Sequence, residues 1–474
     1  MAVKKQDKSY YDAIKELSRD IKTNNYVTGT AQFTDLTNTD YFLKVYGNKV
    51  RFCKPWKKFL VWDKNRWEID EYGEVENFVD DLVRNMYKGA REINDVRLRL
   101  DFESHIKKTE ALRRRKALIE SVSMSQKVKI RPDILDANPL LFNCKNGTID
   151  LEHGNFNAHN PDDYITKCSN FMYQEKADCP TWKVFLLQIM NQDVELIKFV
   201  QKVMGYSMTS DVSEQAIFFL WGNGANGKST FLNVITDLMG DYATSTPTET
   251  FMKKSGDKMS NDIARLRGMR LVTTSEAEQG KRLSEPLIKQ ITGQDTMTAR
   301  FLYGEYFDFK PTFKIFMATN YRPVIRGSDH GIWRRIRLIP FTVTIPPEQR
   351  DKNLSKKLEE ENSGILNWLL EGYVLWRKEG LENPETVVRA TNEYRDEMDT
   401  VGQFLRECCS VDSTGLMRIG NKRLYEMYTN WCAQNNEKLY SQKFLAMRLQ
   451  ERGFRKIIGH NERMWIGLGE KKFT

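Results

Sequence analysis

The stretch from Ala216 to Gly240 constrains the fold more than any other part of this chain. It opens with AIFFLW, a continuous apolar run of the kind that forms a strand buried on both faces of a parallel sheet. The glycine-rich loop GNGANGKS follows at residues 222–229, and STFLNVITDLMG then keeps helical spacing up to a terminal glycine. The order of strand, loop and helix predicts an α/β domain in which the loop turns its backbone N–H groups inward.

The loop matches the pattern G-x-x-x-x-G-K-[ST], which predicts a pocket for the phosphates of a nucleotide. Its glycines let the backbone approach phosphate oxygens closely, and Lys228 is placed to reach the β- and γ-phosphates. The Ser229 hydroxyl is the expected ligand of Mg²⁺, so ATP and Mg²⁺ are the expected cofactors. The predicted nucleotide-binding residues are Gly222, Asn223, Gly224, Ala225, Asn226, Gly227, Lys228, Ser229 and Thr230.

Two later apolar runs predict neighbouring strands that end in polar residues. Leu271–Thr274 is followed by Glu276, the expected acid for Mg²⁺ and for the attacking water. Glu278 is a candidate second carboxylate; the alternative is a strand that simply ends in surface acids. Phe313–Asn320 ends in an amide side chain, which in a parallel sheet would face the same region and orient water.

Two adjacent arginines, Arg334 and Arg335, precede one more predicted strand. An arginine stabilises the negative charge that develops on a transferred phosphoryl group, often from a neighbouring subunit. Because adjacent side chains point in different directions, only one of the two is expected to do this. The alternative is that both are surface or phosphate-binding arginines.

Composition adds broad limits. The 474 residues suit two to four domains, and the formal net charge of +9 is compatible with a polyanionic partner without requiring one. The seven cysteines form no C-x-x-C pair, so they are expected to be reduced and structural, with no zinc. The chain has no apolar run of about 20 residues and no signal-peptide core, so it is expected in a cytoplasm, bacterial or at a viral replication site, away from membranes.

The pattern of segments predicts five parts. KVRF, KFLVWD and RWEI suggest short strands, and helical spacing follows over VENFVDDLVRNMY and FESHIKKTEALRRRKALIESVS. The basic run at residues 113–116 is interpreted as a solvated helix face. A hairpin is expected around Asn146-Gly147 and His153-Gly154, then two amphipathic helices from Cys179 to Thr209. The parts are a lead-in (1–34), an α+β domain (35–175), the nucleotide-binding domain (176–345), a helical connector (346–400) and a small C-terminal domain (401–474).

In combination these motifs resemble superfamily 3 helicases, and more narrowly the helicase part of phage and plasmid primase–helicases related to the poxvirus enzyme. GNGANGKST, the segment RLVTTSEAEQGKRLSEPLIKQITGQDTMTARFLYGEYFDFKPTFKIFMATN, and IWRRIRLIPF carry the resemblance, which extends upstream from about residue 35. It implies an AAA+ P-loop NTPase core of mainly parallel sheet, an N-terminal α+β domain and a winged-helix-like C-terminal domain. It also implies a ring, usually a hexamer, around one DNA strand, with ATP-driven movement from 3′ to 5′.

The resemblance assigns catalytic roles residue by residue. Lys228 and Ser229 match the Walker A positions, and Glu276 matches the Walker B acid. Asn320 matches sensor 1. Arg334 or Arg335 matches the arginine finger, and the alignment does not separate them.

The resemblance also implies a hairpin in the ring channel, matched here by Thr298–Phe309 with Gly304 at its turn. Arg300 and Tyr303 would supply a cation for phosphate and an aromatic ring for base stacking. Lys289 is a further candidate for contact with single-stranded DNA or nucleotide. The alternative is a plain structural hairpin in which Tyr303 packs against its surroundings.

The C-terminal segment has a helix with an apolar stripe, a second helix starting at the capping residue Ser441, and a hairpin turning at residues 459–461. That order resembles a winged helix. Its candidate residues for duplex DNA are Lys443 and Arg448 on the second helix and Arg455 and Lys456 on the wing. The alternative is a module for packing or for recruiting another protein.

The leading hypothesis is therefore an ATP-driven DNA helicase for replication of a phage, plasmid or other mobile element. The short lead-in shows no clustered primase carboxylates, so the primase is expected on a separate chain. A second hypothesis is an origin-binding initiator whose ATPase melts DNA, which selective binding of one duplex would favour. A third is a P-loop loader or remodeller acting on protein, which an ATPase indifferent to DNA would favour.

Overall fold

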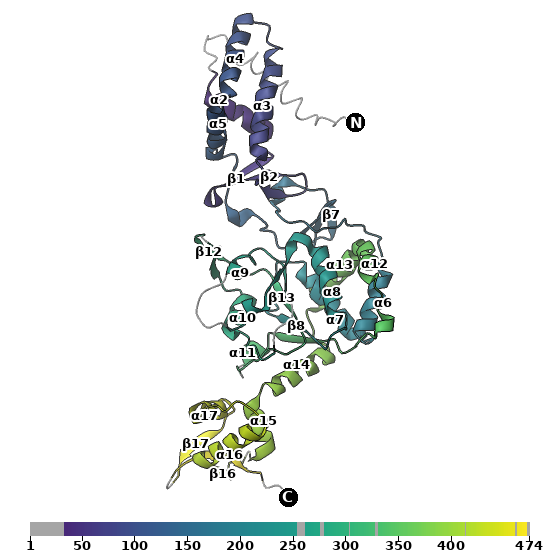
Figure 1. Cartoon of the computed structure of the whole chain (residues 1–474), viewed down its shortest axis with the longest axis vertical. Helices are drawn as coiled ribbons and strands as arrows, with labels where there is room; N and C mark the ends of the chain where they lie inside the picture. The colour runs from purple at the N-terminus through teal and green to yellow at the C-terminus, as the bar shows by residue number, and fades with distance from the viewer. Residues whose placement is uncertain are drawn as a thin grey trace. The chain divides into compact units, whose positions relative to one another are not determined.

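The computed structural model describes residues 33–253, 261–274, 279–302, 304–327, 330–412, 414–459 and 462–471. The chain divides into two compact units (Figure 1). Unit 1 comprises Met1–Ala177, Asp237–Tyr242 and Asn362–Leu366, and unit 2 comprises Asp178–Thr236, Ala243–Glu361 and Asn367–Thr474.

Unit 1 begins with helices packed on a small sheet. The helices are α2 (Asp35–Tyr46), α3 (Glu74–Ala90), α4 (Val96–Thr109) and α5 (Leu112–Met124). The predicted strands are confirmed as β1 (Val50–Cys53), β2 (Lys58–Trp62) and β3 (Trp67–Ile69); β4 (Lys129–Ile130) pairs parallel to β1, and the sheet order is β3-β2-β1-β4. Phe42, Phe102 and Val122 belong to the shared core of these helices.

The segment expected as continuous helix over residues 102–123 is two helices. The chain leaves helical geometry at Ala111, which has an extended ψ of 131°, although no glycine or proline marks the break. The break lets α5 return along α2, where Thr39 Oγ1 donates a hydrogen bond to Ser121 Oγ at 2.9 Å. In the basic run, Arg113 and Lys116 are exposed, whereas Arg115 forms an ion pair with Asp80.

The second sheet of unit 1 is an antiparallel meander of β5 (Leu141–Cys144), β6 (Gly147–Asp150) and β7 (Asn155–Asn157). It confirms the predicted hairpin at Asn146-Gly147. Gly154, in the turn before β7, has φ +70°, a conformation that costs glycine little.

Unit 2 is built on a five-stranded parallel sheet in the order β14-β8-β13-β10-β9. The strands are β8 (Ile217–Trp221), β9 (Ala243–Thr246), β10 (Leu271–Thr274), β13 (Lys314–Thr319) and β14 (Ile336–Pro340). Burial of every residue of β10 and β13 explains why these strands appear as continuous apolar-rich runs in the sequence. The mixed α/β class with a parallel sheet is confirmed.

Helices cover this sheet. The two predicted amphipathic helices are confirmed as α6 (Pro180–Ile189) and α7 (Val194–Ser207), and the helix after the loop is α8 (Lys228–Met239). Shorter helices are α9 (Asn261–Ala264), α10 (Glu285–Thr292) and α11 (His330–Trp333). The predicted hairpin is confirmed as β11 (Met297–Arg300) paired antiparallel with β12 (Tyr306–Phe309).

After the sheet the chain forms α12 (Leu354–Glu360), α13 (Asn362–Glu379) and α14 (Glu385–Glu397). Helix α14 lies against β14, since Thr391 Oγ1 accepts a hydrogen bond from Leu338 N at 3.1 Å. Tyr394 of α14 is fully buried and meets Phe219 of β8 edge-on, with ring centroids 6.2 Å apart. Helix α14 is thus part of the sheet's core.

The C-terminal part of unit 2 is a small α/β module. It contains α15 (Thr400–Cys408), β15 (Cys409–Val411), β16 (Arg418–Gly420), α16 (Asn421–Gln434), α17 (Gln442–Glu451), β17 (Arg455–Ile458), β18 (Arg463–Ile466) and β19 (Leu468–Glu470). Strands β16, β18 and β17 form an antiparallel sheet in that order. The predicted order of two helices and a hairpin is confirmed, as is the cap of α17, where Ser441 Oγ accepts from Phe444 N at 3.3 Å.

Across the described ranges, every helix is too short or too polar to cross a membrane.

Candidate functional site

The loop at residues 222–227 lies at the carboxyl edge of the parallel sheet. It leaves the end of β8 and enters α8 at Lys228. Strand β13 pairs with β8 so that Thr319 lies opposite Trp221, and Asn320 therefore follows at the edge where Gly222 begins the loop. Carboxyl edges of parallel sheets are where α/β proteins bind ligands.

Lys228 and Asn320, two predicted site residues 92 positions apart, are in contact. The Lys228 side chain is buried, with 5% of its surface exposed. Its Nζ donates hydrogen bonds to the Gly222 carbonyl and to Asn320 Oδ1, the latter at 3.1 Å. A buried ammonium requires such acceptors, because an unpaired one would lose its hydration without compensation.

The loop has a specific backbone shape that the segment after β14 supports. Ala225 takes φ +61°, an uncommon left-handed conformation for a residue with a Cβ. Its carbonyl accepts from Ile345 N at 2.8 Å, and the buried Asn226 side chain donates to the Phe341 carbonyl at 3.1 Å. A Cβ added at Gly222 would lie 2.1 Å from that same Phe341 carbonyl oxygen, so only glycine fits there.

Gly227 is constrained from the other side. It has φ +83°, and an added Cβ would lie 2.5 Å from Cγ2 of Ile189 on α6. The two glycines Gly222 and Gly227 therefore hold the loop close to its supports, whereas Gly224 has open space around it. The loop is a tight backbone cradle opening onto the first turn of α8, and helix N-termini attract anions.

Ser229 is exposed in the first turn of α8, where a hydroxyl can bind a metal ion held by phosphates. In the described ranges, no group of three or more His, Cys, Asp or Glu side chains is arranged to hold a metal ion. The predicted acids Glu276 and Glu278 follow β10 in the chain but lie outside the described residues.

The two candidate arginines lie in different environments. Arg335 is buried, with 8% of its surface exposed; its Nε donates to Thr292 Oγ1 at 3.0 Å and its Nη1 donates to the Gly331 carbonyl. Arg334 is exposed, and its Nη2 donates to Gln215 Oε1 at 2.6 Å. Both precede β14, and so lie at the amino edge of the sheet, opposite the loop.

The β11–β12 hairpin presents an exposed cluster near its tip. Arg300 and Tyr306 are directly paired across the two strands, and the Arg300 guanidinium lies 5.0 Å from the centre of the Tyr306 ring. Tyr306 is 65% exposed, and Phe301 and Leu302 beside it are 46% and 70% exposed. Tyr303 lies outside the described residues.

Tyr306 was missed by the sequence reasoning. Its position two residues after Gly304 could have identified it, because pairing of the two hairpin strands places Tyr306 directly across from Arg300. Gly304 N donates to the Phe301 carbonyl at 2.9 Å, in agreement with the predicted turn. Lys289, the other candidate in this region, is half-buried in the last turn of α10.

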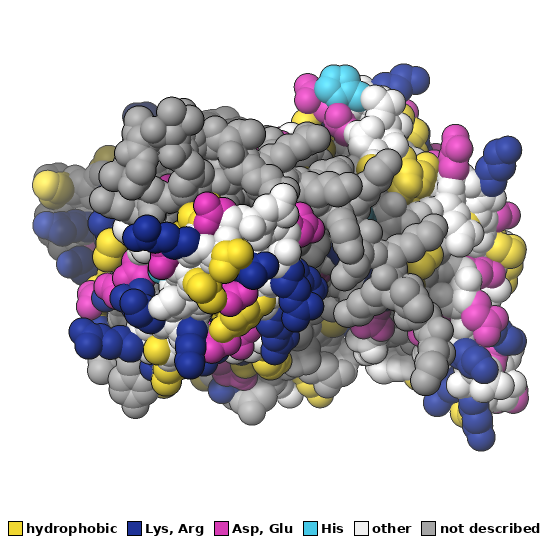
Figure 2. Space-filling model, turned by 90° about the horizontal axis from the view of Figure 1, so that it is seen from above, with side chains coloured by type: hydrophobic (Ala, Val, Ile, Leu, Met, Phe, Trp, Pro, Cys, Tyr) yellow, Lys and Arg dark blue, Asp and Glu magenta, His cyan; other side chains and the backbone are white. Residues whose placement is uncertain are grey.

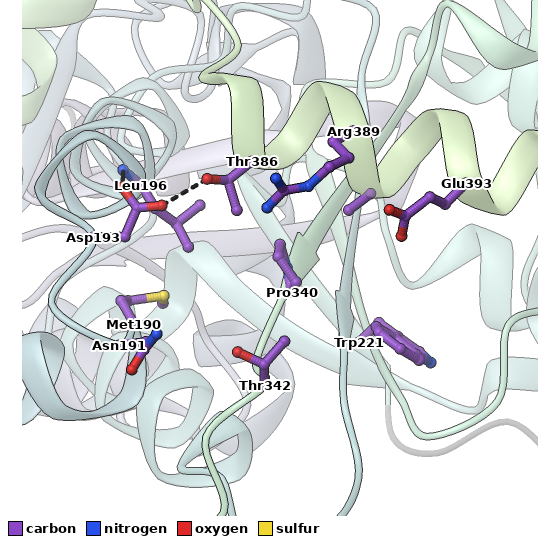
Figure 3. Close-up of a pocket in the computed structure, with 11 residues that line it drawn as sticks. Met190, Asn191, Asp193, Leu196, Trp221, Pro340, Thr342, Thr386, Arg389 and Glu393 are labelled. Atoms are coloured by element: carbon purple, nitrogen blue, oxygen red, sulfur yellow. Dashed lines mark hydrogen bonds between the residues drawn. The ribbon is translucent and has the colours of Figure 1, made fainter.

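A pocket of about 300 Å³ adjoins the loop, and no residue pattern in the sequence indicated it (Figure 3). Its walls come from the α6–α7 turn, the ends of β8 and β14, and one side of α14. The lining residues are Met190, Asn191, Asp193, Leu196, Trp221, Pro340, Thr342, Thr386, Arg389, Ala390 and Glu393.

The predicted duplex-binding residues of the C-terminal module differ in availability. Lys443 and Arg455 are exposed. Arg448 is largely covered; its Nη1 donates to Glu451 at 2.9 Å and its Nη2 donates to the Arg326 carbonyl. Lys456 lies with its Nζ 4.6 Å from the centre of the Trp465 ring, and burial together with Arg463 lowers the pKa of Lys456.

Positive and negative side chains are mixed on one face of the molecule. On the face shown in Figure 2, Lys and Arg side chains lie among Asp and Glu side chains with hydrophobic ones between them. The net charge of the chain therefore does not by itself locate a polyanion-binding surface.

Two family patterns match the chain. Residues 39–191 match the family described as "D5 N terminal like", and residues 220–335 match a family of unknown function (DUF5906). The chain is 32% identical over 324 residues to "Putative helicase L207/L206" of Acanthamoeba polyphaga mimivirus, covering 64% of this chain and 34% of the relative. It is 23% identical over 347 residues to "Putative primase C962R" of African swine fever virus, covering 67% of this chain and 35% of the relative.

The chain thus spans about a third of the length of these relatives. Among solved structures, it resembles the apo structure of the NrS-1 C terminal region, with a TM-score of 0.51 and 11% identity over 91% of this chain and 99% of that one. A second apo form of that region gives a TM-score of 0.52 and 10% identity. At this identity the likeness concerns the fold alone.

Proposed function

We propose that this chain is an ATP-dependent DNA helicase of superfamily 3, related to viral primase–helicases. It would act in the replication of a phage, plasmid or other mobile element. The hydrogen bond between Lys228 and Asn320 is the observation that carries the proposal. It brings the lysine of the phosphate-binding loop beside a polar residue at the end of the adjacent strand, where a residue that positions water is expected. The strand order β14-β8-β13-β10-β9 also supports an AAA+ P-loop core.

The cradle fits a triphosphate. Gly222 and Gly227 allow the backbone to approach where a Cβ would collide, and the α8 N-terminus favours negative charge. In this mechanism Lys228 binds the β- and γ-phosphates of ATP. Ser229 and Glu276 would hold Mg²⁺, which would supply positive charge to neutralise the phosphates. Asn320 would orient the attacking water, and in the structure it lies within hydrogen-bonding distance of Lys228.

Arg334 is the better candidate for the arginine finger. The guanidinium of Arg335 is already bound inside the fold by Thr292 and Gly331, whereas Arg334 is exposed. The five residues of β14 span roughly 16 Å at ~3.3 Å per residue, and Arg334 precedes this strand, at the opposite end from the carboxyl edge of its own sheet. It is therefore suited to the nucleotide of a neighbouring copy, and a ring, expected to be a hexamer, provides such a neighbour.

The β11–β12 hairpin is proposed to grip single-stranded DNA in the ring channel. Arg300 supplies a charge for phosphate, and the exposed rings of Tyr306 and Phe301 supply surfaces for base stacking. Movement from 3′ to 5′ is part of this proposal and rests on the family resemblance.

The C-terminal module is proposed to be a winged helix that contacts duplex DNA. The order α15, β16, α16, α17, β17, β18 supports this, because a helix followed by a β-hairpin is the arrangement of that fold. Among the residues predicted to bind the duplex, Lys443 and Arg455 are exposed and available to phosphates, while Arg448 is engaged within the protein. Selective binding of one duplex by this module would favour the origin-binding alternative.

The test is ATP hydrolysis by the full chain with and without single-stranded DNA. The wild type should be stimulated several-fold by DNA and should separate a forked duplex, and Lys228→Ala should do neither. Lys352→Ala, an exposed lysine in the same unit, is the matched control and should behave as wild type. Hydrolysis that is indifferent to DNA would overturn the helicase proposal and favour action on protein; hydrolysis unaffected by Lys228→Ala would overturn the assignment of the site.

A further inference from the structure

Several residues that line the pocket are sequence neighbours of the phosphate loop or of the segment that supports it. Trp221 lines the pocket and immediately precedes Gly222, and Pro340 and Thr342 line it on either side of Phe341. The Phe341 carbonyl supports the loop by accepting a hydrogen bond from the Asn226 side chain. The backbone N–H of Phe341 donates to the Trp221 carbonyl at 2.7 Å. The pocket and the loop therefore share the carboxyl edge of the sheet, at the ends of β8 and β14.

The pocket is held open by fixed contacts between its walls. Thr386 at the start of α14 donates from Oγ1 to Asp193 Oδ2 at 2.6 Å, and Asp193 Oδ1 caps α7 by accepting from Leu196 N at 3.0 Å (Figure 3). Asn191 reaches the wall through a turn with φ +52°. Trp221 is held by Arg322, whose guanidinium lies 4.0 Å from the centre of the ring.

Two charged side chains of the pocket are uncommitted. Arg389 and Glu393 stand four residues apart on α14 and project toward the strand ends that carry Pro340 and Trp221 (Figure 3). Within the described part of the chain neither side chain forms a hydrogen bond or an ion pair, even with the other, and both residues are exposed. Asp193, by contrast, has both carboxylate oxygens engaged.

The chemistry of the pocket matches the nucleoside part of a nucleotide. Its volume of about 300 Å³ is at the lower end for small-ligand sites, and polar side chains make up much of its lining. Trp221, which is half-buried, provides a flat apolar surface in the pocket, whereas Met190 and Leu196 are almost fully buried. An arginine only donates and a carboxylate only accepts, so the pair complements a base edge that carries a ring-nitrogen acceptor beside an amino group.

We propose that this pocket binds the purine base of the nucleoside triphosphate, with Arg389 donating to a ring nitrogen and Glu393 accepting from an exocyclic amino group. The inference rests on the proposed function, because it takes the loop at residues 222–229 as the phosphate site. It makes α14 a determinant of which nucleotide is bound. Adenine and guanine both carry the required groups, as cytosine also does at N3 and its amino group. A purine is proposed because its larger ring covers more of the Trp221 ring, and the experiment distinguishes the two purines.

The experiment measures binding to the full chain by calorimetry. Five probes are used: non-hydrolysable analogues of ATP and GTP, purine riboside triphosphate, UTP and inorganic tripolyphosphate. Arg389→Ala should weaken binding of all three purine triphosphates about tenfold, the loss expected for one charge-assisted hydrogen bond. Tripolyphosphate binding should stay unchanged, because it needs only the loop.

Glu393→Ala should weaken the preferred analogue, of ATP or of GTP, about tenfold and leave purine riboside triphosphate unchanged, since that base has no amino group. Arg395→Ala, an exposed arginine on the same helix outside the pocket, is the matched control and should match wild type. The wild type should bind UTP more weakly than the preferred purine.

Three results would overturn the assignment. Unchanged nucleotide binding in Arg389→Ala and Glu393→Ala would exclude the pocket as the base site. A parallel loss of tripolyphosphate binding would mean that α14 acts on the phosphates. In either of these two outcomes, a loss of binding of every probe in Lys228→Ala would leave the proposed function standing and overturn only the base site. A wild type that binds none of the probes would overturn both the proposed function and the base site.

Discussion

Lys228 Nζ lies 3.1 Å from Oδ1 of Asn320, although the two residues are 92 positions apart in the chain. The contact exists because β8 and β13 are parallel neighbours, so the residues that follow both strands share one edge of the sheet. It gives Asn320 two connected roles in the proposed mechanism. It holds Lys228 in place, and it lies where a water would attack the terminal phosphate.

Asn320→Ala is expected to lower the rate of ATP hydrolysis about a hundredfold, the loss typical of removing one polar group from a charge-developing centre. Binding of a non-hydrolysable ATP analogue should weaken much less, because Lys228 and the loop remain. Steady-state hydrolysis and calorimetric binding separate the two effects. Thr391→Ala, which also removes a hydrogen-bonding side chain from unit 2, is the comparison for general destabilisation. Equal losses of rate and affinity would argue against a role for Asn320 in the chemical step.

The site could be predicted from the sequence where its parts are contiguous. The strand, loop and helix around Lys228 are consecutive, and a polar residue ending an apolar strand singles out Asn320. The pocket could not be predicted, because Asn191, Trp221, Pro340 and Arg389 come from four separated segments that only the fold brings together. Tyr306 was missed because its pairing with Arg300 depends on hairpin register.

The fold shows the same division. Periodicity was sufficient for the strands and for α6, α7 and α8, but the break between α4 and α5 has no local marker and follows from packing of α5 along α2. The difference between Arg334 and Arg335 was equally invisible in sequence. It arises because only one of two neighbours can point into the core, and Thr292 and Gly331 receive that one.

Substitution of Arg334 is expected to impair ATP hydrolysis, whereas substitution of Arg335 is expected to destabilise the fold. Arg334→Ala should fold normally and lose about a thousandfold or more in ATP hydrolysis, the size of effect for an arginine finger. Arg335→Ala should instead lower the free energy of unfolding by about 2–3 kcal/mol, because it strips charge-assisted hydrogen bonds from buried acceptors. Thermal unfolding and hydrolysis, measured on both variants, discriminate the roles.

Action across subunits adds a second measurement for Arg334. Inactive Lys228→Ala chains mixed with inactive Arg334→Ala chains should regain part of the activity, because some interfaces then combine an intact loop with an intact arginine. Mixing with Arg335→Ala chains provides the comparison. Mixed assemblies, once demonstrated by differential tagging, that show no recovery would count against action in trans.

Tyr306→Ala is expected to weaken binding of single-stranded DNA about tenfold, within the range for losing one stacked base. Basal ATP hydrolysis without DNA should be unchanged, because the hairpin does not touch the loop at residues 222–227 in the proposed mechanism. Fluorescence anisotropy of a labelled oligonucleotide measures the affinity. Tyr72→Ala, an almost fully exposed tyrosine in unit 1, is the control. Matching affinities for the two variants would leave the hairpin a structural element only.

His105 is expected to make unit 1 sensitive to mild acid. It is 6% exposed, and its Nε2 lies 2.9 Å from Oδ1 of Asn38, whose Nδ2 donates to Thr109 Oγ1 at 3.2 Å. The Asn38 oxygen therefore accepts from Nε2–H. Burial, the largest cause, together with Arg114 lowers the pKa of His105 below its usual 6.5, since both disfavour the charged imidazolium.

A lowered folded-state pKa means that the unfolded chain takes up a proton first as the pH falls. The contribution of His105 to stability is therefore complete above about pH 6.5 and declines as the pH drops from 6.5 through the folded-state pKa. Urea unfolding, followed by probes in unit 1, should show the wild type losing stability between pH 7.5 and 5 by more than His105→Gln, which cannot titrate there. His153 is exposed, and its hydrogen bond with Asp150 raises its pKa, so protonation of His153 favours the folded state as the pH falls. His153→Gln should therefore retain the acid-induced loss of stability caused by His105. Identical pH dependence in wild type and His105→Gln would show that His105 is not held neutral by the fold.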